Sequence, residues 1–566
     1  MTSLNSTVAA YLDRPLKRAN YYVAAGLIAA IYTFHLFPVE FFIGTSGFWF
    51  NTHTDPTQHI TGMWAFAQDK WRFPLLYTTL LNAPEGVSVA FTDSIPLAAL
   101  LFKPFYAWLP AGSHYFGFWV FLCYFLQGLA GAWAAATISS RSVAALVAGT
   151  LFALMMPALM IRIPHAALLF QCSLIVMLVL YYQLNGGHVS LDRFVVSSVA
   201  LLLMAGTIHL YLLAMLYTLY VAALVDRVCR IRSWRAFGSS LSLALLPAPL
   251  LLLIFFLLGY LAFSGGLPPA ENGFTESSMN LLSPLLGTHL APSGFIPTEG
   301  VVLDATGLQI DGHNYLGLAV LFMLGFAALN QPSALLRLLR GHVPMTLVLL
   351  GLVAYSVSNV VYLGGNEVLR YSLPGWVEPL TRIFRGSGRF FWPVGYALML
   401  LGVGFFLTRP NPAFRLGLLA LVVVQYVDTA PHRAYLAEAA HREPVFAYGR
   451  ALWDERIKRA SAVYLLPAYG CGALGDDALF LQYFTSLHAV PFNTGFIARA
   501  ATDCPAKNKV LSHQRLPGEL FVFKRSEYSD AQIRAAMGAQ AEQWCNEESI
   551  GVVCIVPAEV SGRRVQ

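Results

Sequence analysis

The sequence predicts a polytopic α-helical membrane protein that ends in a small exported α/β region. Of its 566 residues, 57% are hydrophobic and only 12% are charged, whereas a soluble domain has roughly 25% charged residues. Aromatic residues make up 13% of the chain, which excludes a disordered protein. Apolar stretches of bilayer length recur as far as Asp428, and the character of the chain changes after this residue. These observations exclude a soluble globular enzyme.

The apolar stretches are expected to form about eleven transmembrane helices, since a span needs about 20 apolar residues. The first covers about 21–43, follows Arg14, Lys17 and Arg18, and is too long for a signal-peptide core. We therefore expect a retained anchor with a cytoplasmic N-terminus. His209 interrupts the stretch 192–226, which is expected to form two short spans. The remaining spans are expected at about 115–138, 142–161, 165–183, 192–208, 211–226, 237–263, 314–331, 342–363, 390–408 and 412–428.

The charges of the short loops support spans that cross the membrane in alternating directions. The loops on one side carry only two acids, Asp192 and Asp226, among many arginines, as the positive-inside rule requires of the cytoplasmic face. The long polar segments 44–113, 264–313 and 364–389 then fall on the extracytoplasmic face, together with everything after Asp428. The cytoplasmic arginines are Arg141, Arg193, Arg227, Arg230, Arg232, Arg235, Arg337, Arg340, Arg409 and Arg415.

Two domains are expected, a membrane domain over 1–428 that includes the first outer loop (about 44–113), and an extracytoplasmic α/β domain over 429–566. Short β-like runs at 461–467, 519–524 and 550–557 predict the strands of the second domain. Four cysteines in an exported domain favour two disulfides, in any of three connectivities, over four free thiols. These cysteines are Cys471, Cys504, Cys545 and Cys554.

The first outer loop contains the acidic residue of most interest, Asp55. An Asp-Pro pair is a good helix start, so Asp55 is either the N-cap of a helix lying on the membrane surface or a base in a medium of lowered dielectric. A metal cluster with His53 and His59 is not favoured, because no regular zinc spacing results. A second interfacial helix is expected over 93–110, where Lys103 either snorkels or binds an anion.

Further polar residues lie at the outer ends of the expected spans. Arginine is well shaped for bidentate contact with phosphate, so the arginines among them are candidate phosphate ligands. Alternatively they snorkel at the interface or pair with loop acids such as Glu367 and Glu378, and His313 and Asn314 only cap a span. The residues are Arg162, His165, His209, Tyr211, His313, Asn314, Arg370, Arg382, Arg385 and Arg389.

Several motifs in the same order along most of the chain resemble the GT-C class of membrane glycosyltransferases, and more closely an uncharacterised bacterial family within it. GT-C enzymes use a polyprenyl-phosphate sugar, and an acidic residue of their first outer loop acts as general base or orients the acceptor. The resemblance therefore assigns this role to Asp55 and implies the bacterial inner membrane. The motifs are TDPTQHITGMWAF with WRFPL (54–75), PEGVSVAFTDSIPL (84–97), RIPHAAL (162–168), HLYL (209–212), HNYLG (313–317), RGSGRFFWP (385–393) and PFNTGFIAR (491–499).

The leading hypothesis is an inverting glycosyltransferase, with Asp55 as base, that transfers a sugar to a glycan, lipid or protein hydroxyl on the outer face. No D-x-D pair follows Asp55, so no cofactor is expected, although dependence on a divalent metal stays open. The alternatives are a transporter or lipid flippase, and an inactive glycan-binding scaffold. We expect the donor phosphate to be bound by Arg162, His165, Arg370, Arg382, Arg385, Arg389 and Lys103, and the rest of the substrates by His59, Asp93, His209, Tyr211, His313 and Asn314.

Overall fold

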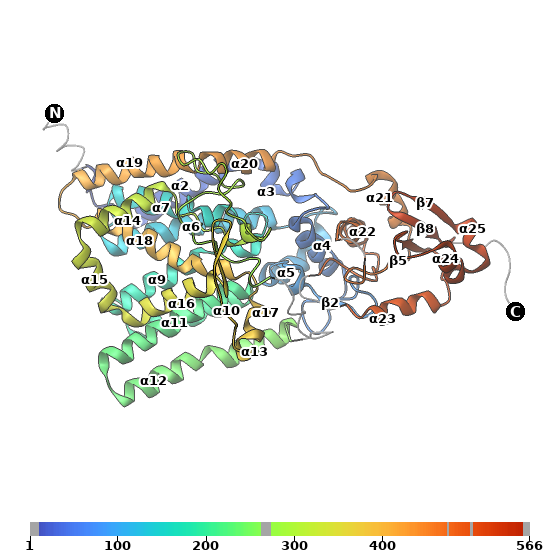
Figure 1. Ribbon diagram of the computed structural model, residues 1–566, viewed down its shortest axis with the longest axis horizontal. Helices are drawn as coiled ribbons and strands as arrows, with labels where there is room; N and C mark the ends of the chain where they lie inside the picture. The colour runs from blue at the N-terminus through green and yellow to red at the C-terminus, as the bar shows by residue number, and fades with distance from the viewer. Residues whose placement is uncertain (1–10, 262–272, 473–474, 498–501, 558–566) are drawn as a thin grey trace. The chain divides into compact units, whose positions relative to one another are not determined.

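A computed structural model describes residues 11–261, 273–472, 475–497 and 502–557 (Figure 1). The chain forms two compact units. Unit 1 comprises Met1–Phe42, Phe118–Leu252 and Ala270–Ala440, and unit 2 comprises Ile43–Gly117, Leu253–Pro269 and His441–Gln566. The first outer loop therefore belongs to the same unit as the C-terminal region, although the sequence groups it with the membrane helices. The end of the expected span 237–263, the start of the segment 264–313 and the end of the motif 491–499 lie outside the described residues.

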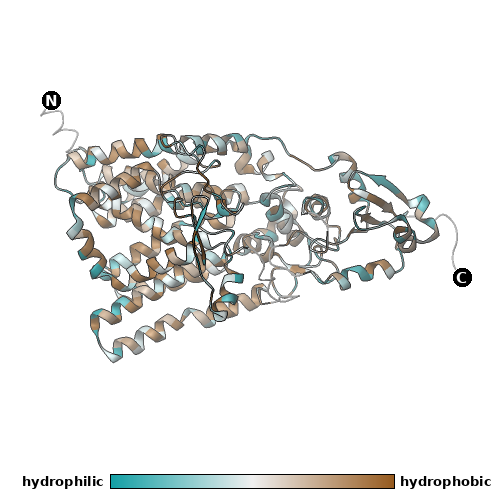
Figure 2. Ribbon diagram, viewed as in Figure 1, coloured by the Kyte–Doolittle hydropathy of each residue, from teal (hydrophilic) through white to brown (hydrophobic). Residues whose placement is uncertain are grey.

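Unit 1 consists mainly of apolar helices, which appear brown in Figure 2. Shorter elements between them position polar residues: η4 (Ala166–Leu169), η5 (Gln309–Gly312), a hairpin of β3 (Val360–Leu363) and β4 (Asn366–Arg370), η6 (Gly375–Val377), α17 (Glu378–Ile383) and η7 (Ser387–Phe391). The short α8 (Pro157–Met160) lies among the longer helices. The longer helices are α2 (Arg18–Leu36), α6 (Phe116–Ile138), α7 (Val143–Leu154), α9 (Cys172–Asn185), α10 (Leu191–Gly206), α11 (Leu210–Ile231), α12 (Trp234–Leu245), α13 (Pro247–Leu258), whose second half belongs to unit 2, α14 (Leu318–Asn330), α15 (Pro332–Gly341), α16 (Val343–Ser356), α18 (Trp392–Leu407), α19 (Ala413–Asp428) and α20 (Ala430–Ala440).

Five helical segments among the described residues are long and apolar enough to cross a membrane. Two further pairs of helices, α14 with α15 and α19 with α20, are bent at a short break and raise the number to seven if each pair is one span. This number indicates a membrane protein, while the expected eleven spans remain a prediction. The five segments are Phe116–Ile138, Ala166–Asn185, Leu210–Ile231, Trp234–Leu258 and Ser387–Leu407.

Helices α6 and α7 approach each other closely at two glycines. A Cβ atom on Gly131 would lie 2.1 Å from the carbonyl oxygen of Gly149, and a Cβ on Gly149 would lie 2.5 Å from the carbonyl oxygen of Gly131. Backbone atoms cannot give way as the end of a side chain can, so a side chain at either position would force the two helices apart.

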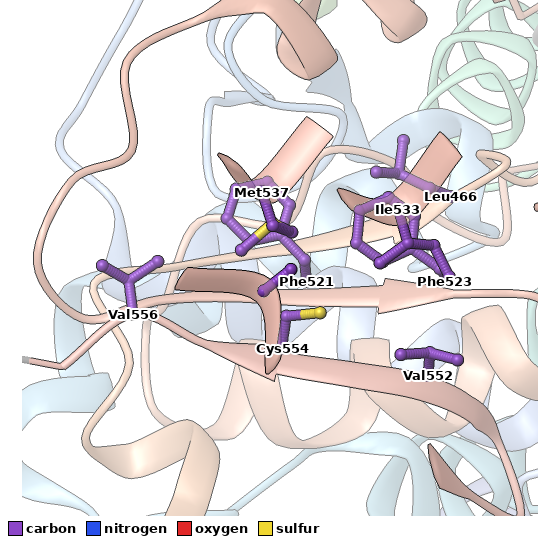
Figure 3. Packing of buried hydrophobic residues seen from close by; sticks show 9 residues of the cluster. Leu466, Phe521, Phe523, Ile533, Met537, Val552, Cys554 and Val556 are labelled. Carbon is purple, nitrogen blue, oxygen red and sulfur yellow. The ribbon is translucent and has the colours of Figure 1, made fainter. Parts of the chain in front are cut away.

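The C-terminal part of unit 2 contains a four-stranded sheet of order β5-β6-β8-β7. Strands β5 (Ala462–Leu466) and β6 (Glu519–Phe523) are parallel, and β8 (Gly551–Ile555) is antiparallel to both β6 and β7 (Cys545–Glu548). The three expected strands are confirmed, whereas the polar β7 was not predicted. Apolar side chains of the sheet pack with Ile533 and Met537 of α24 (Asp530–Met537) (Figure 3).

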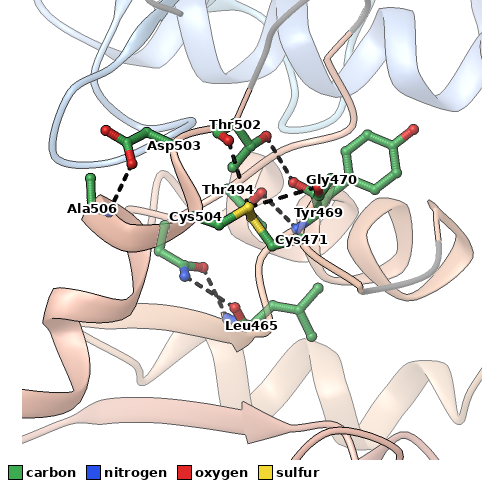
Figure 4. The surroundings of a disulfide bond; sticks show 10 residues. Leu465, Tyr469, Gly470, Cys471, Thr494, Thr502, Asp503, Cys504 and Ala506 are labelled. Carbon is green, nitrogen blue, oxygen red and sulfur yellow. Dashed lines mark hydrogen bonds between the residues drawn. A yellow bond between two sulfur atoms is a disulfide. The ribbon is translucent and has the colours of Figure 1, made fainter. Parts of the chain in front are cut away.

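Two disulfides are present, as expected, and the structure selects one connectivity. Cys471 pairs with Cys504, and Cys545 pairs with Cys554. The second bond joins directly opposed residues of β7 and β8. The first bond lies beside Tyr469, whose backbone accepts a hydrogen bond from the hydroxyl of Thr502 at 2.9 Å (Figure 4).

The expected helix after Asp55 exists as α4 (Asp55–Gln68), but its expected position on a membrane surface is wrong. All residues from Pro56 to Phe66 are buried within unit 2. The helix packs against α22 (Gly475–Leu487), where Gln482 donates a hydrogen bond to Thr61 at 2.7 Å and the rings of Trp64 and Tyr483 are 5.4 Å apart. The polar side chains of α4 therefore contact protein, although the sequence pattern predicts that they face water.

Unit 2 is completed by short elements. In the first loop these are η1 (Gly47–Trp49), a hairpin of β1 (Tyr77–Thr78) and β2 (Val87–Ser88), η2 (Val89–Thr92), α5 (Pro96–Phe102) and η3 (Lys103–Trp108). Helix α3 (Val39–Ile43) precedes them at the end of the first segment of unit 1. In the C-terminal region they are α21 (Arg450–Lys458), α23 (Cys504–Asn508), η8 (Lys509–Ser512), η9 (Gly538–Gln540) and α25 (Ala541–Trp544).

The substitution Gly131→Ala is expected to destabilise the protein by about 1–3 kcal/mol, because the added methyl group overpacks the crossing of α6 and α7. Gly325→Ala in α14 is the matched control, since a Cβ there meets no atom within 4 Å. Thermal unfolding of the purified chains in detergent should show a lower Tm for Gly131→Ala only. An unchanged Tm for Gly131→Ala would contradict the close approach of the two helices.

Candidate functional site

The carboxylate of Asp311 in unit 1 lies between two arginines. Arg162 follows α8, Asp311 lies in η5, and Arg389 lies in η7. Nη1 of Arg162 donates a hydrogen bond to Oδ1 of Asp311, and Nη2 of Arg389 donates to Oδ2 at 2.6 Å. The two arginines are 149 and 78 residues away from Asp311 along the chain. One carboxylate therefore joins three distant segments of unit 1.

Both guanidinium groups are held by further contacts. Nη2 of Arg162 donates to the backbone carbonyls of Ile310 and Asp311 at 3.1 and 3.0 Å. The guanidinium of Arg389 lies 4.8 Å from the centre of the Tyr211 ring, and the Tyr211 hydroxyl in turn accepts a hydrogen bond from the backbone N–H of Gly386 at 2.7 Å. These contacts fix the guanidinium planes, a requirement for directional binding of an oxyanion.

The three side chains are buried to different degrees. The exposed fractions are 3% for Arg162, 12% for Arg389 and 21% for Asp311. Arg389 and Asp311 are therefore partly accessible from outside, while Arg162 is enclosed by protein.

The cluster carries a surplus of positive charge. Burial alone would raise the pKa of Asp311, but the guanidiniums of Arg389 and Arg162 outweigh this effect and hold the pKa well below its usual value. Burial lowers the pKa of Arg162, yet arginine stays protonated in proteins. Two cations and one anion leave a net charge of about +1 in a protected position, which favours binding of a further anion.

Several buried polar atoms near this cluster have no hydrogen-bond partner among the described residues. They include Nε of Arg162, Nε1 of Trp392, both ring nitrogens of His313 and Oδ1 of Asn314. The Trp392 ring lies 5.9 Å from the guanidinium of Arg162. A buried polar atom without a partner is costly, so such a group of atoms indicates bound water or a polar ligand.

His313 is uncharged at neutral pH. Burial lowers its pKa to about 3, and the nearby guanidinium of Arg162 adds to this effect. One ring nitrogen of a neutral imidazole donates and the other accepts, so His313 can bind a hydroxyl group in either direction. Its neighbour Asn314 joins η5 to η7 by donating hydrogen bonds to the carbonyls of Gly312 and Gly388 at 2.8 and 2.9 Å.

A cavity of about 100 Å³ lies next to this region. Ile310, adjacent to Asp311 in the chain, is part of its wall, as is His289. The carboxylate of Asp304, also in the wall, accepts hydrogen bonds from the backbone N–H groups of Gly307 and Gln309 at 2.7 and 3.0 Å, and so shapes the loop that leads into η5. Such a cavity is large enough to hold several water molecules.

The structure brings some of the predicted residues to the Asp311 cluster. Tyr211 and Arg389 are in contact, and His165 lies close enough to Asp311 to lower the pKa of its carboxyl group. His209 lies at the start of α11, where its Nδ1 accepts a hydrogen bond from the N–H of Tyr211 at 3.2 Å. His209 is therefore a helix cap that orients Tyr211.

Three predicted phosphate ligands lie elsewhere in unit 1. Arg370 pairs with Glu367, and Arg382 pairs with Glu378 at 2.6 Å, so these arginines follow the alternative in which loop acids neutralise them. Arg385 is exposed and packs against Gly273. Of the four arginines before α18, only Arg389 contacts Asp311.

Asp55 opens α4 in unit 2. Thr54 occupies the N-cap position, so the interpretation of Asp55 as the N-cap residue is wrong by one position. His53, two residues earlier, lies 2.7 Å from a carboxylate oxygen of Asp476 at the start of α22. Asp55 belongs to unit 2 and Asp311 to unit 1, so the expectation that Asp55 and the arginines share one cavity stays a prediction.

The other predicted residues of unit 2 have structural surroundings. His59 is buried in α4, and its carbonyl accepts a hydrogen bond from Ser94 at 2.7 Å. Asp93 ends η2 with a left-handed backbone, at a φ of 52°. Lys103 is buried and donates a hydrogen bond to the carbonyl of Phe66 at 2.6 Å, with its ammonium 4.0 Å from the Phe66 ring. Lys103 thus caps the C-terminal end of α4, a role that neither predicted alternative describes.

Asp311 was missed in the sequence. It lies two residues before the singled-out His313, in a loop with several other acids, and local sequence does not distinguish them. Asp311 comes just before one expected span, and Arg162 comes at the outer end of another. This combination was the signal in the sequence from which their contact could have been predicted. Among the described residues, no group of three or more His, Cys, Asp or Glu side chains is placed to hold a metal ion.

Replacing Lys103 by methionine should change how stability depends on pH. Burial lowers the pKa of Lys103 from 10.5 to about 8, so between these values the unfolded chain binds more protons than the folded chain. The stability of the wild type relative to Lys103→Met should therefore rise with pH from about 8 to 10.5, by at most about 3 kcal/mol. Chemical unfolding of both chains across this range measures the difference, and a difference independent of pH would contradict the assignment.

Comparison with known families gives two matches. The family model described as a domain of unknown function, DUF6311, matches residues 26–430, and the model described as the DUF6311 C-terminal domain matches residues 452–556. No curated protein matches the chain. Since the first match alone covers most of the sequence, the chain belongs to the DUF6311 family.

Proposed function

We propose that this protein is a membrane glycosyltransferase, which transfers a sugar from a polyprenyl-phosphate donor to an acceptor hydroxyl on the extracytoplasmic face. The observation that carries the proposal is the pair of guanidiniums, of buried Arg162 and largely buried Arg389, that share the single carboxylate of Asp311. A lipid-linked sugar phosphate is an anion that needs such a surplus of positive charge near the bilayer. The resemblance to GT-C enzymes supplies the reaction type.

In the proposed reaction, Asp55 accepts the proton of the acceptor hydroxyl. The acceptor oxygen forms a bond to the anomeric carbon, and the bond from that carbon to the phosphate oxygen breaks. Polyprenyl phosphate leaves with the electron pair, and Arg162 and Arg389 stabilise the negative charge that develops on it. Charge stabilisation of this kind is usually the largest single contribution to catalysis. Displacement from the opposite face inverts the anomeric configuration.

The buried polar atoms beside the arginines suit the sugar of the donor. Neutral His313 offers one donor and one acceptor, and Oδ1 of Asn314 offers a further acceptor. Sugar hydroxyl groups both donate and accept hydrogen bonds, so they match this set better than a hydrocarbon chain would. We assign His313 and Asn314 to the sugar and the two arginines to the phosphate.

A transporter or lipid flippase is the second candidate, and the bent helices favour it. Helices α19 and α20 meet at 49° across a short break. Transporters place broken helices at their substrate sites, often near the bilayer midplane. The two candidates share an anionic lipid substrate, and they differ in whether a covalent product forms.

Arg389→Gln should lower the rate of transfer about 100-fold or more, because removal of one donor to a developing oxyanion typically costs that much. The matched control is Arg370→Gln, which removes an exposed arginine paired with Glu367 and should change the rate less than about twofold. The assay uses the full chain in proteoliposomes with a panel of polyprenyl-phosphate sugars and follows both the product and the donor. Equal effects of the two substitutions would contradict the assignment of the phosphate site.

Asp55→Asn should abolish transfer while donor binding, measured as thermal stabilisation, stays intact. Undiminished transfer by Asp55→Asn would refute its role as base but would not contradict the assignment of the phosphate site. Donor movement across the bilayer without a covalent product would instead establish the flippase. Donor binding without either activity would identify an inactive scaffold.

A further inference from the structure

Helix α15 lies almost perpendicular to the apolar helix that precedes it. The axes of α14 and α15 meet at 99° across a break at Gln331, and Pro332 begins α15. Pro332 cannot donate a backbone hydrogen bond, which makes it a natural start for a new helix. A helix at a right angle to an apolar helix that enters the bilayer runs along the membrane surface.

The side chains of α15 separate into two faces. Leu335, Leu336, Leu338 and Leu339 follow the spacing of one helical face, and Arg337 and Arg340 lie on the opposite face. No residue of α15 is buried, and the exposed fractions of Leu336, Leu338 and Leu339 are 42–46%. An exposed apolar face opposite a basic face is typical of a helix that lies in the interface of a membrane.

The arginines of α15 have no counter-charge among the residues that the structure describes. Neither Arg337 nor Arg340 takes part in an ion pair among the described residues, and the sequence has no acid between 312 and 365. His342, directly after α15, lies 3.1 Å from Nη2 of Arg230 at the end of α11. Arg232 in the turn after α11 and Arg235 in the first turn of α12 add further positive charge at this end of unit 1.

We propose that α15 binds the headgroups of anionic phospholipids. The leucines insert among the upper acyl carbons, and Arg337 and Arg340 bind lipid phosphates at the surface. Anionic lipids attract basic segments strongly at such positions, with a free energy equivalent to about fivefold in affinity for each arginine. Zwitterionic lipids would cover the leucines equally well but would leave both arginines without a net counter-charge. This inference does not depend on the proposed enzymatic activity.

The test titrates the delipidated full chain in detergent with phosphatidylglycerol or phosphatidylcholine and follows thermal unfolding. Phosphatidylglycerol should stabilise the wild type at lower concentration than phosphatidylcholine does. Arg337→Gln/Arg340→Gln should lose about tenfold or more of this preference. The control Lys458→Gln/Arg534→Gln removes two exposed charges from unit 2 and should keep it.

A second variant controls for an effect of the substitutions on folding. Arg337→Lys/Arg340→Lys keeps both charges and should keep the preference for phosphatidylglycerol. Equal stabilisation of the wild type by the two lipids would overturn the proposal, and so would a full preference in the Gln variant. Loss of the preference in the Lys variant as well would contradict a charge-based contact and would favour a protein partner on this face.

Discussion

The structure of unit 1 depends on one shared carboxylate. Asp311 accepts hydrogen bonds from Arg162 and Arg389, and so joins the segment after α8, the loop before α14 and the turn that begins α18. Burial of each charge costs several kcal/mol, and one carboxylate cannot compensate two guanidiniums completely. The protein thus maintains a protected surplus of positive charge, which is more useful for binding an anion than for stability.

The second constraint is the joint folding of two distant parts of the chain. The first outer loop and the C-terminal region form unit 2, through contacts such as Gln482 with Thr61 and an ion pair of Lys507 with Glu85 at 2.6 Å. Asp55 therefore begins a helix whose far side packs on the C-terminal region.

Composition and hydropathy were sufficient to predict a helical membrane protein, three of the four strands of the C-terminal sheet and two disulfides. The Asp311 cluster was only half predicted, because Arg162 and Arg389 were visible as arginines at span ends but their common partner depends on tertiary structure. Arg370 and Arg382 have the same local pattern as Arg389, yet acids three or four residues earlier in the chain neutralise them. The amphipathic pattern of α4 was misleading for the same reason, since its polar side chains face protein instead of water.

The central claim is that Arg162 and Arg389 bind the phosphate of a lipid-linked sugar. An experimental structure of the full chain with a non-hydrolysable polyprenyl-phosphate sugar tests it most directly. The account predicts phosphate density within hydrogen-bond distance, about 2.7–3.2 Å, of both guanidinium groups. Density for the phosphate at another place, with both arginines still in their contacts with Asp311, would contradict it.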